Sequence, residues 1–217
     1  ASFEEVAYML LYGKLPNAAE LTQYKTRLTG MRELPDALKA CLELIPASAH
    51  PMDVMRTGCS MLGNLETEGC FSEQMDKVDR MLALFPSIIT YWYRFSHQGV
   101  RIETATDHDS IGAHFLYCLL GEEPSELHTR VMDVSLILYA EHEFNASTFT
   151  ARVCASTLSD IHSTITGAIG SLRGPLHGGA NEAAMELIEQ WASPEEAERA
   201  LMKMLADKAK IMGFGHA

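Results

Sequence analysis

Apolar residues recur along the chain with the spacing of amphipathic helices. Val6, Met9 and Leu10 share one helical face, and similar spacing continues through most of the sequence. Alternation of apolar and polar residues between hairpin turns, which would indicate strands, is missing. The pattern therefore predicts an all-α protein. The predicted helices span residues 2–12, 17–29, 36–45, 51–65, 73–85, 87–97, 110–120, 125–143, 147–171, within which a break stays open, and 181–210, with a break near 192.

Residues that favour helix starts flank these segments. Ser2, Asn17 and Ser193 each precede a glutamate by three positions, which is the spacing of a capping box. We expect Pro86 to mark the start of the helix predicted at 87–97, because proline is poorly tolerated inside a helix. The segment 125–143 is apolar nearly all round, which predicts full burial.

Composition and charge fit a folded protein of one domain, or of one domain and a fragment. The 217 residues include 17 Lys and Arg against 29 Asp and Glu, a formal net charge of −12, and 47% are apolar. The acid excess argues against a general nucleic-acid-binding protein, which needs clustered basic residues. No apolar run approaches the roughly 18–20 residues of a membrane helix. We therefore expect neither nucleic acid nor a membrane as a partner.

The five cysteines contain no CxxC pair, and most have apolar neighbours. Buried free thiols in a reducing compartment are the simplest interpretation. The first residues do not resemble a signal peptide. The expected localisation is therefore cytoplasmic, with an organelle matrix reached by a removed presequence as the alternative. The sequence begins within a predicted helix and stops in a glycine-rich turn at residues 213–217, which predicts a piece of a longer protein.

Three histidines stand in segments that suit a ligand site. His177 and His216 are flanked by glycines, which let the backbone approach a ligand closely. His142 lies in a polar stretch at the end of an apolar helix, where buried polar groups need partners. Asn181 is placed to cap the helix that follows His177. Structural roles are the commoner explanation for such histidines, and a metal site is disfavoured because no HxxxH or CxxC spacing occurs.

Four segments together resemble the citrate synthase family. Residues 174–181, with the sequence GPLHGGAN, resemble the family signature, and residues 142–147, HEFNAS, resemble its His-Glu-x-Asn-x-Ser segment. Residues 213–216, GFGH, are similar to its Gly-Tyr/Phe-Gly-His turn, and residues 50–53, HPMD, to its His-Pro-Met helix start. The resemblance covers the whole chain in the same order, which makes it far more specific than any one segment.

Within that family, residues 107–115 and 139–150 are most similar to the 2-methylcitrate synthases. This subgroup of acyltransferases condenses propionyl-CoA with oxaloacetate and water to 2-methylcitrate and CoA, in the 2-methylcitrate cycle of propionate catabolism. The resemblance implies the same reaction here. Because many members also accept acetyl-CoA, a citrate synthase is the near alternative. An alternative of another class is a catalytically incomplete helical dimerisation module.

The resemblance also implies roles for individual residues. His177 is expected to donate a hydrogen bond, as a neutral imidazole, to the enolate formed from the thioester. His216 is expected to hydrogen-bond the keto oxygen of oxaloacetate and to protonate the new alkoxide, and His142 to bind oxaloacetate. The family's aspartate base and carboxylate-binding arginines are expected beyond Ala217. The residues expected to contact CoA are Lys210, Ile211, Met212, Gly213 and Phe214, with Arg94 as a further candidate for one of its phosphates.

Finally, the resemblance implies a domain organisation and an assembly. A large helical domain is expected over 1–176, without its N-terminal part, and the beginning of an incomplete small domain over 177–217, with the glycines near 174–178 as a hinge. A homodimer with helices packed across the two-fold axis is expected, and the apolar segment 125–143 suits that contact. No metal or prosthetic group is implied, and CoA enters as part of the thioester substrate.

Overall fold

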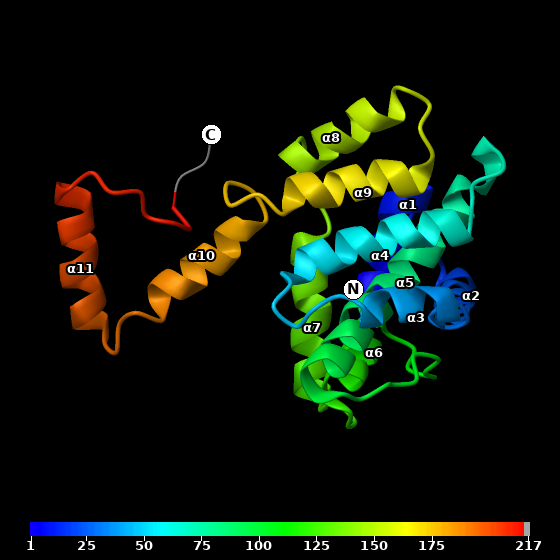
Figure 1. The fold of residues 1–217 in the computed structure, drawn as a ribbon, viewed down its shortest axis with the longest axis horizontal. Coiled ribbons are helices and arrows are strands. Elements are labelled where there is room, and N and C mark those ends of the chain that lie inside the picture. The colour runs from blue at the N-terminus through cyan, green and yellow to red at the C-terminus, as the bar shows by residue number, and fades with distance from the viewer. Residues whose placement is uncertain (215–217) are drawn as a thin grey trace.

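The structure is a computed structural model that describes residues 1–214, and this part of the chain is helical, without strands (Figure 1). The prediction of an all-α fold is confirmed. The helices are α1 (Phe3–Tyr12), α2 (Ala18–Thr29), α3 (Asp36–Glu43), α4 (Pro51–Leu65), the 3₁₀-helix η1 (Phe71–Glu73), α5 (Gln74–Gln98), α6 (Ile111–Leu120), α7 (Glu126–Tyr139), α8 (Ala146–Ala155), α9 (Ile161–Leu172), α10 (Gly179–Ile188) and α11 (Pro194–Ala206).

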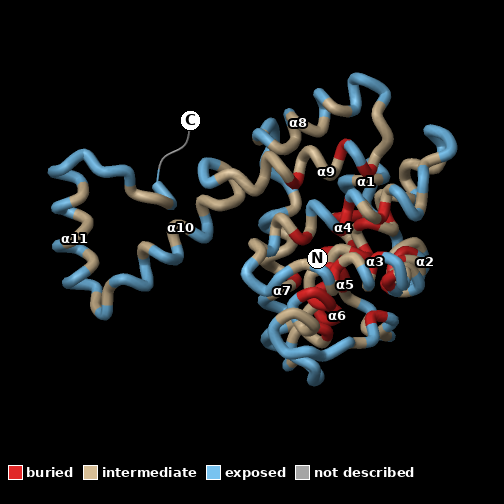
Figure 2. The backbone as a smooth tube through the Cα atoms, in the orientation of Figure 1, coloured by how far each residue is buried: buried red, intermediate tan, exposed pale blue. Residues whose placement is uncertain are grey.

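Helices α1–α9, which we call the body, pack around one another, whereas α10 and α11, which we call the arm, lie apart from them (Figure 1). Figure 2 shows the buried residues of the described chain within the body. Neither arm helix contains a buried residue. The body therefore has a hydrophobic core, and the arm as described has none.

The core of the body lies along α4 and α5. Leu62 of α4 and Leu84 and Ile88 of α5 are completely buried, and side chains of α3 and α9 complete the cluster. Helix α9 packs along α4, and the end of α9 lies toward the start of α4 (Figure 1). This packing places the turn that follows α9 beside the first residues of α4.

A buried carboxylate joins α1 and α2 to α5. Asp79 of α5 is fully buried. It accepts hydrogen bonds from the hydroxyls of Tyr12, at 2.6 Å, and Tyr24, at 3.1 Å, and from Nε of Arg27, at 2.9 Å. A buried charge is tolerated when it is paired and hydrogen-bonded in this way. The cluster fixes the N-terminal helices without contributing to the site described below.

Two of the three predicted capping boxes form. The side chains of Ser2 and Asn17 accept from the backbone three residues on, and the glutamates there return the bond. At α11, Oγ of Ser193 accepts from the N–H of Glu196 at 3.3 Å, but the Glu196 carboxylate accepts from the N–H of Ala192 at 3.0 Å instead. The start of α11 is confirmed, and only half of its capping box is.

The predicted break at Pro86 is wrong, because α5 runs unbroken from Gln74 to Gln98 with the proline inside it. The residues on either side explain this outcome. Leu84, Ser87 and Ile88 are completely buried, so tertiary packing on both sides of the proline overrides its local cost. The break left open within 147–171 does occur, between α8 and α9, and the break near 192 separates α10 from α11.

The predicted burial of 125–143 is also wrong for this chain. The helix ends at Tyr139, and Asp133 is its buried residue. Leu127, Val131 and Leu138 are 70%, 56% and 75% exposed. The described residues provide nothing to cover this face, although it is as apolar as the sequence indicates.

The cysteines were predicted to be buried free thiols. All five cysteines are free, with Cys59 and Cys118 buried as predicted and Cys70 exposed. Burial raises the pKa of the Cys118 thiol to about 11.

In the described part of the chain, every helix is too short or too polar to cross a lipid bilayer.

Candidate functional site

His177 lies in the tight turn that connects α9 to α10. The turn is closed by backbone hydrogen bonds, from the N–H of His177 to the carbonyl of Gly174 at 3.0 Å and from the N–H of Gly178 to the carbonyl of Leu172 at 2.9 Å. A Cβ atom at Gly178 would collide with the Leu172 carbonyl oxygen. Glycine is required there by this close approach of backbone to backbone, so the turn presents His177 in one position.

The imidazole of His177 sits at the N-terminus of α8. Its Nε2 is 3.3 Å from the backbone nitrogen of Ser147 and 2.9 Å from the Ser147 hydroxyl. Asn145 caps this helix by accepting from the N–H of Thr148 at 2.9 Å, and its Oδ1 lies 2.7 Å from the Ser147 hydroxyl. The hydroxyl donates to Asn145, and the backbone N–H of Ser147 donates to the His177 ring.

This contact determines the protonation state of His177. A backbone N–H can only donate, so the Nε2 atom that receives it carries no proton. We therefore assign the proton to Nδ1 and the ring as neutral. The free N–H at the N-terminus of α8 finds an acceptor, and the other edge of the ring becomes a hydrogen-bond donor. His177 is half-buried.

Two candidate segments of the sequence are therefore in contact. Ser147 is the last residue of the segment 142–147, and His177 lies in the segment 174–181. His142 itself is exposed, in the loop between α7 and α8. The next residue, Glu143, has a positive φ of 48°, and its N–H donates to the Glu141 carboxylate. A non-glycine residue in this region is uncommon and marks a constrained loop. Sequence reasoning singled out His142 and His177 as candidates but did not foresee the contact of Ser147 with His177.

Asn181 does not cap α10, contrary to the prediction. The helix begins at Gly179, so Asn181 lies in its first turn, and its Nδ2 donates to the hydroxyl of Tyr139 at 2.9 Å. The next residue, Glu182, places Oε2 3.1 Å from Nε2 of His50. The arm is therefore joined to the ends of two body helices by side-chain hydrogen bonds.

The segment expected to contact CoA follows α11. Met212, Gly213 and Phe214 line a cavity of about 690 Å³ between α10 and α11, together with mostly apolar side chains such as Leu187 and Trp191. Gly213 has a φ of +91° and lies against Ala184, so a side chain would be strained there. Lys210 is exposed, and the carbonyl of Ile211 accepts from the N–H of Phe214 at 3.4 Å. His216 lies outside the described residues.

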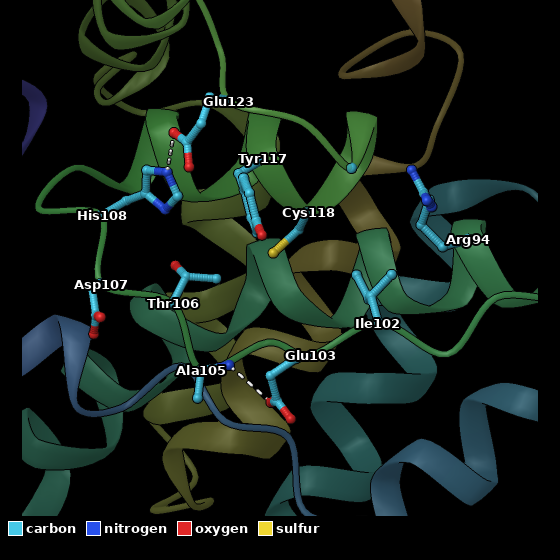
Figure 3. Close-up of a pocket in the computed structure, with 11 residues that line it drawn as sticks. Arg94, Ile102, Glu103, Ala105, Thr106, Asp107, His108, Tyr117, Cys118 and Glu123 are labelled. Carbon is cyan, nitrogen blue, oxygen red and sulfur yellow. Dashed lines mark hydrogen bonds and ion pairs between the residues drawn. The ribbon is translucent and has the colours of Figure 1, made fainter.

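Arg94 lines a different cavity, of about 620 Å³, between α5, α6 and the segment before α6 (Figure 3). Its Nη1 donates to the carbonyl of Leu119 at 3.0 Å. Three carboxylates, those of Glu103, Asp107 and Glu123, line the same cavity. This excess of negative charge disfavours a phosphate, so the position of Arg94 gives no support to a CoA contact.

The segment 107–115 contributes to the body rather than to the His177 site. His114 is completely buried between Ser87 and Thr106, whose hydroxyls lie 3.0 Å and 2.9 Å from its two ring nitrogens. Desolvation, with a smaller contribution from Arg32, lowers its pKa to about 3. His114 is therefore neutral in the folded protein at physiological pH.

The chain is similar to known proteins along its whole length. Residues 1–217 match the family described as citrate synthase, C-terminal domain. The chain is 73% identical over 217 residues to a 2-methylcitrate synthase of Shewanella oneidensis, covering 58% of that protein. It is 42% identical over 215 residues to a citrate synthase of Heyndrickxia coagulans, covering 98% of this chain and 57% of that protein. The chain thus spans less than two thirds of these relatives.

Solved structures of citrate synthases are similar over all of this chain. The enzyme of Thermotoga maritima has a TM-score of 0.86 at 38% identity, and 57% of that chain is covered. The enzyme of Thermoplasma acidophilum, solved as a ternary complex with carboxymethyl coenzyme A and oxaloacetate, has a TM-score of 0.90 at 31% identity, with 57% covered. The arrangement of helices described above is therefore the one found in those enzymes.

Proposed function

The chain belongs to the citrate synthase family, and on this premise we propose that the complete protein condenses propionyl-CoA with oxaloacetate to 2-methylcitrate and CoA. Identity of 73% to a 2-methylcitrate synthase, against 42% to a citrate synthase, favours propionyl-CoA over acetyl-CoA. The chain covers 58% of the first of these relatives, so the proposal concerns the complete protein. The reaction belongs to propionate catabolism.

The single observation that supports this chemistry best is the neutral His177, held by the backbone N–H of Ser147. The α-carbon of a thioester is a weak acid, and removing its proton places negative charge on the thioester oxygen. A fixed donor aimed at that oxygen lowers the barrier without being deprotonated itself. In our proposal, Nδ1–H of His177 is this donor. Its neutral state suits the task because the ring can hydrogen-bond to the enolate and keep its proton.

Other groups complete the proposed reaction. His142 binds oxaloacetate, and His216 donates to the keto oxygen and protonates the alkoxide formed when the new carbon–carbon bond closes. An aspartate outside these 217 residues removes the α-proton. Water then hydrolyses the thioester of the product and releases CoA. In this proposal CoA takes part only as the carrier of the acyl group.

The CoA moiety is proposed to lie along residues 210–214. The cavity lined by Met212, Gly213 and Phe214 supports this placement, because most of its lining is apolar. Lys210, at the edge of the segment, supplies a positive charge for a phosphate. The domain assignment follows the same proposal, with a large domain over 1–176 and the start of a small one over 177–217.

A homodimer is part of the proposal. The exposed apolar face of α7, with Leu127, Val131 and Leu138, is what a second copy would cover. Light scattering of the complete protein at micromolar concentration should give twice the subunit mass, and a clean monomer would contradict this assembly. We also propose a reducing compartment, the cytoplasm, because all five cysteines are free.

The direct test is release of the CoA thiol by the complete protein. Oxaloacetate is supplied with propionyl-CoA in one arm and acetyl-CoA in the other, and a reaction without oxaloacetate is the control. We expect a higher kcat/KM with propionyl-CoA. A higher value with acetyl-CoA would make the protein a citrate synthase. Dimer formation without thiol release in either arm would favour the catalytically incomplete dimerisation module.

A further inference from the structure

The segment His50-Pro51-Met52-Asp53 has no part in the reaction proposed above. It begins α4, and the packing of α4 against α9 places it beside the turn that carries His177 (Figure 1). We propose that His50 and Asp53 form a clamp on both sides of this turn and act as positioning residues for His177. This inference rests on the proposed function for its catalytic consequence, and on the structure alone for the clamp.

The downstream half of the clamp is His50. Its Nδ1 accepts from the N–H of Met52 at 3.1 Å, so Nδ1 carries no proton and caps α4. The proton is therefore on Nε2, which donates to Oε2 of Glu182 at 3.1 Å. Glu182 lies in the first turn of α10, five residues after His177. The cap at the start of α4 thus fixes the tautomer of His50, and the Nε2–H of that tautomer binds Glu182 at the start of α10.

The upstream half is Asp53, in the first turn of α4. Its Oδ2 lies 3.5 Å from Nε of Arg173, the C-cap residue that follows α9 and precedes the turn. Its Oδ1 lies 3.1 Å from Nη2 of Arg56, one turn further along α4. Asp53 is therefore oriented between two guanidinium groups, one of which belongs to the turn. In the sequence, His177 lies between Arg173 and Glu182. Both of these residues contact the segment 50–53, which begins α4.

The clamp matters because few contacts hold the downstream side of the turn: besides His50 and Glu182, Asn181 donates to the hydroxyl of Tyr139 at 2.9 Å. The turn is rich in glycine, at positions 174, 178 and 179, and α10 contains no buried residue. Hydrophobic packing therefore does not fix the direction in which α10 leaves His177. A preorganised donor loses much of its effect when it is displaced by about 1 Å. Polar contacts at both ends of the turn are the available means of preventing that displacement.

Two substitutions at His50 separate its capping role from its clamp role. His50→Asn keeps a good N-cap acceptor but is too short to reach Glu182. His50→Gln provides an amide donor that reaches toward Glu182 but loses the cap. In the complete protein we expect His50→Asn to lower kcat about three- to tenfold, the worth of about one hydrogen bond, with KM for oxaloacetate and the melting temperature nearly unchanged. His50→Gln should lower the melting temperature and retain more of kcat.

Partner and control variants complete the experiment. Glu182→Ala should match His50→Asn, and the double variant should be no worse than either, because both remove the same contact. Glu186→Ala is the matched control, since it removes an exposed carboxylate one turn further along α10. Amide hydrogen exchange of residues 177–179 serves as a readout independent of activity. It should accelerate about three- to tenfold in the first two single variants and stay unchanged in the control.

The outcomes distinguish the clamp from the proposed function. Unchanged exchange and unchanged kcat in both His50→Asn and Glu182→Ala would overturn the clamp and leave the proposed reaction intact. Accelerated exchange in a protein whose wild type releases no CoA thiol would reject the reaction and retain the clamp. Equal losses of kcat in Glu186→Ala would also overturn the clamp, because the effect would then be a general one of charge on α10.

Discussion

The body and the arm are held in place by different forces. In the body, side chains such as Leu62, Leu84 and Ile88 are completely removed from water, so hydrophobic burial fixes the position of each helix. The arm has no buried residue, and individual hydrogen bonds such as that of Asn181 to Tyr139 join it to the body. His177 lies at the junction. Stability and chemistry are therefore separable in this molecule, and substitutions should affect one without the other.

The largest expected effect is on the stability of the body. Leu84→Ala removes a completely buried side chain from the centre of α5 and should destabilise the complete protein by about 3–5 kcal/mol. Urea denaturation followed by circular dichroism measures this loss. The kcat of the protein that remains folded should be close to normal. A large fall in kcat together with normal stability would contradict the separation of body and site.

The converse effect is expected at the junction. His177→Ala removes the proposed donor and should lower kcat by roughly two to three powers of ten. Its melting temperature should stay near that of the wild type, because His177 is only half-buried. His97→Ala, which removes an exposed histidine at the end of α5, is the control and should keep normal turnover. Near-normal kcat in folded His177→Ala would remove this residue from the mechanism.

Acid should reveal a further property of the body. His114 is buried with its pKa lowered to about 3, whereas an unfolded histidine titrates near its ordinary value of 6.5. Between these values the unfolded chain binds the additional proton, so stability falls as the pH falls, by at most about 1.4 kcal/mol per pH unit. Denaturation curves from pH 7 to 4 should show a smaller slope in His114→Gln. The same slope in both proteins would contradict the buried neutral state of His114.

The smallest effect is expected at Ser147. Ser147→Ala removes the hydroxyl that lies 2.9 Å from Nε2 of His177 but leaves the backbone N–H that fixes the tautomer. Turnover should fall about three- to tenfold, far less than in His177→Ala. Steady-state kinetics of the two variants side by side give the ratio. An equal loss in both would show that the hydroxyl, rather than the N–H, controls the ring.

Local signals in the sequence predicted most helix starts, because a cap is a contact between near neighbours. Ser2 and Asn17 cap as predicted, and α4 has the predicted bounds. Pro86 was not predicted correctly, because burial of distant residues against α5 outweighs the local cost of proline. The exposure of α7 also depends on what covers it, and a single chain cannot specify that.

The candidate site was predictable only in part. Glycine-flanked His177 and the polar segment after His142 carry local signals, so sequence reasoning selected both as candidates. The contact of His177 with Ser147 joins residues 30 positions apart and depends on how α8 packs against α9. Glu182 carried no signal, because an acidic residue in an acidic stretch usually faces solvent. Its role became visible only when the structure placed it opposite His50.

The amide that holds His177 also makes the protonation state of this histidine tolerant of mutation at position 147. A group supplied by the main chain is present whatever side chain occupies position 147, so drift at that position leaves the ring's tautomer intact. Proline, which has no N–H, is the single exception among the twenty residues. Neutrality of the histidine is therefore buffered against nearly every point mutation at its own contact, and selection needs to guard only the path of the backbone.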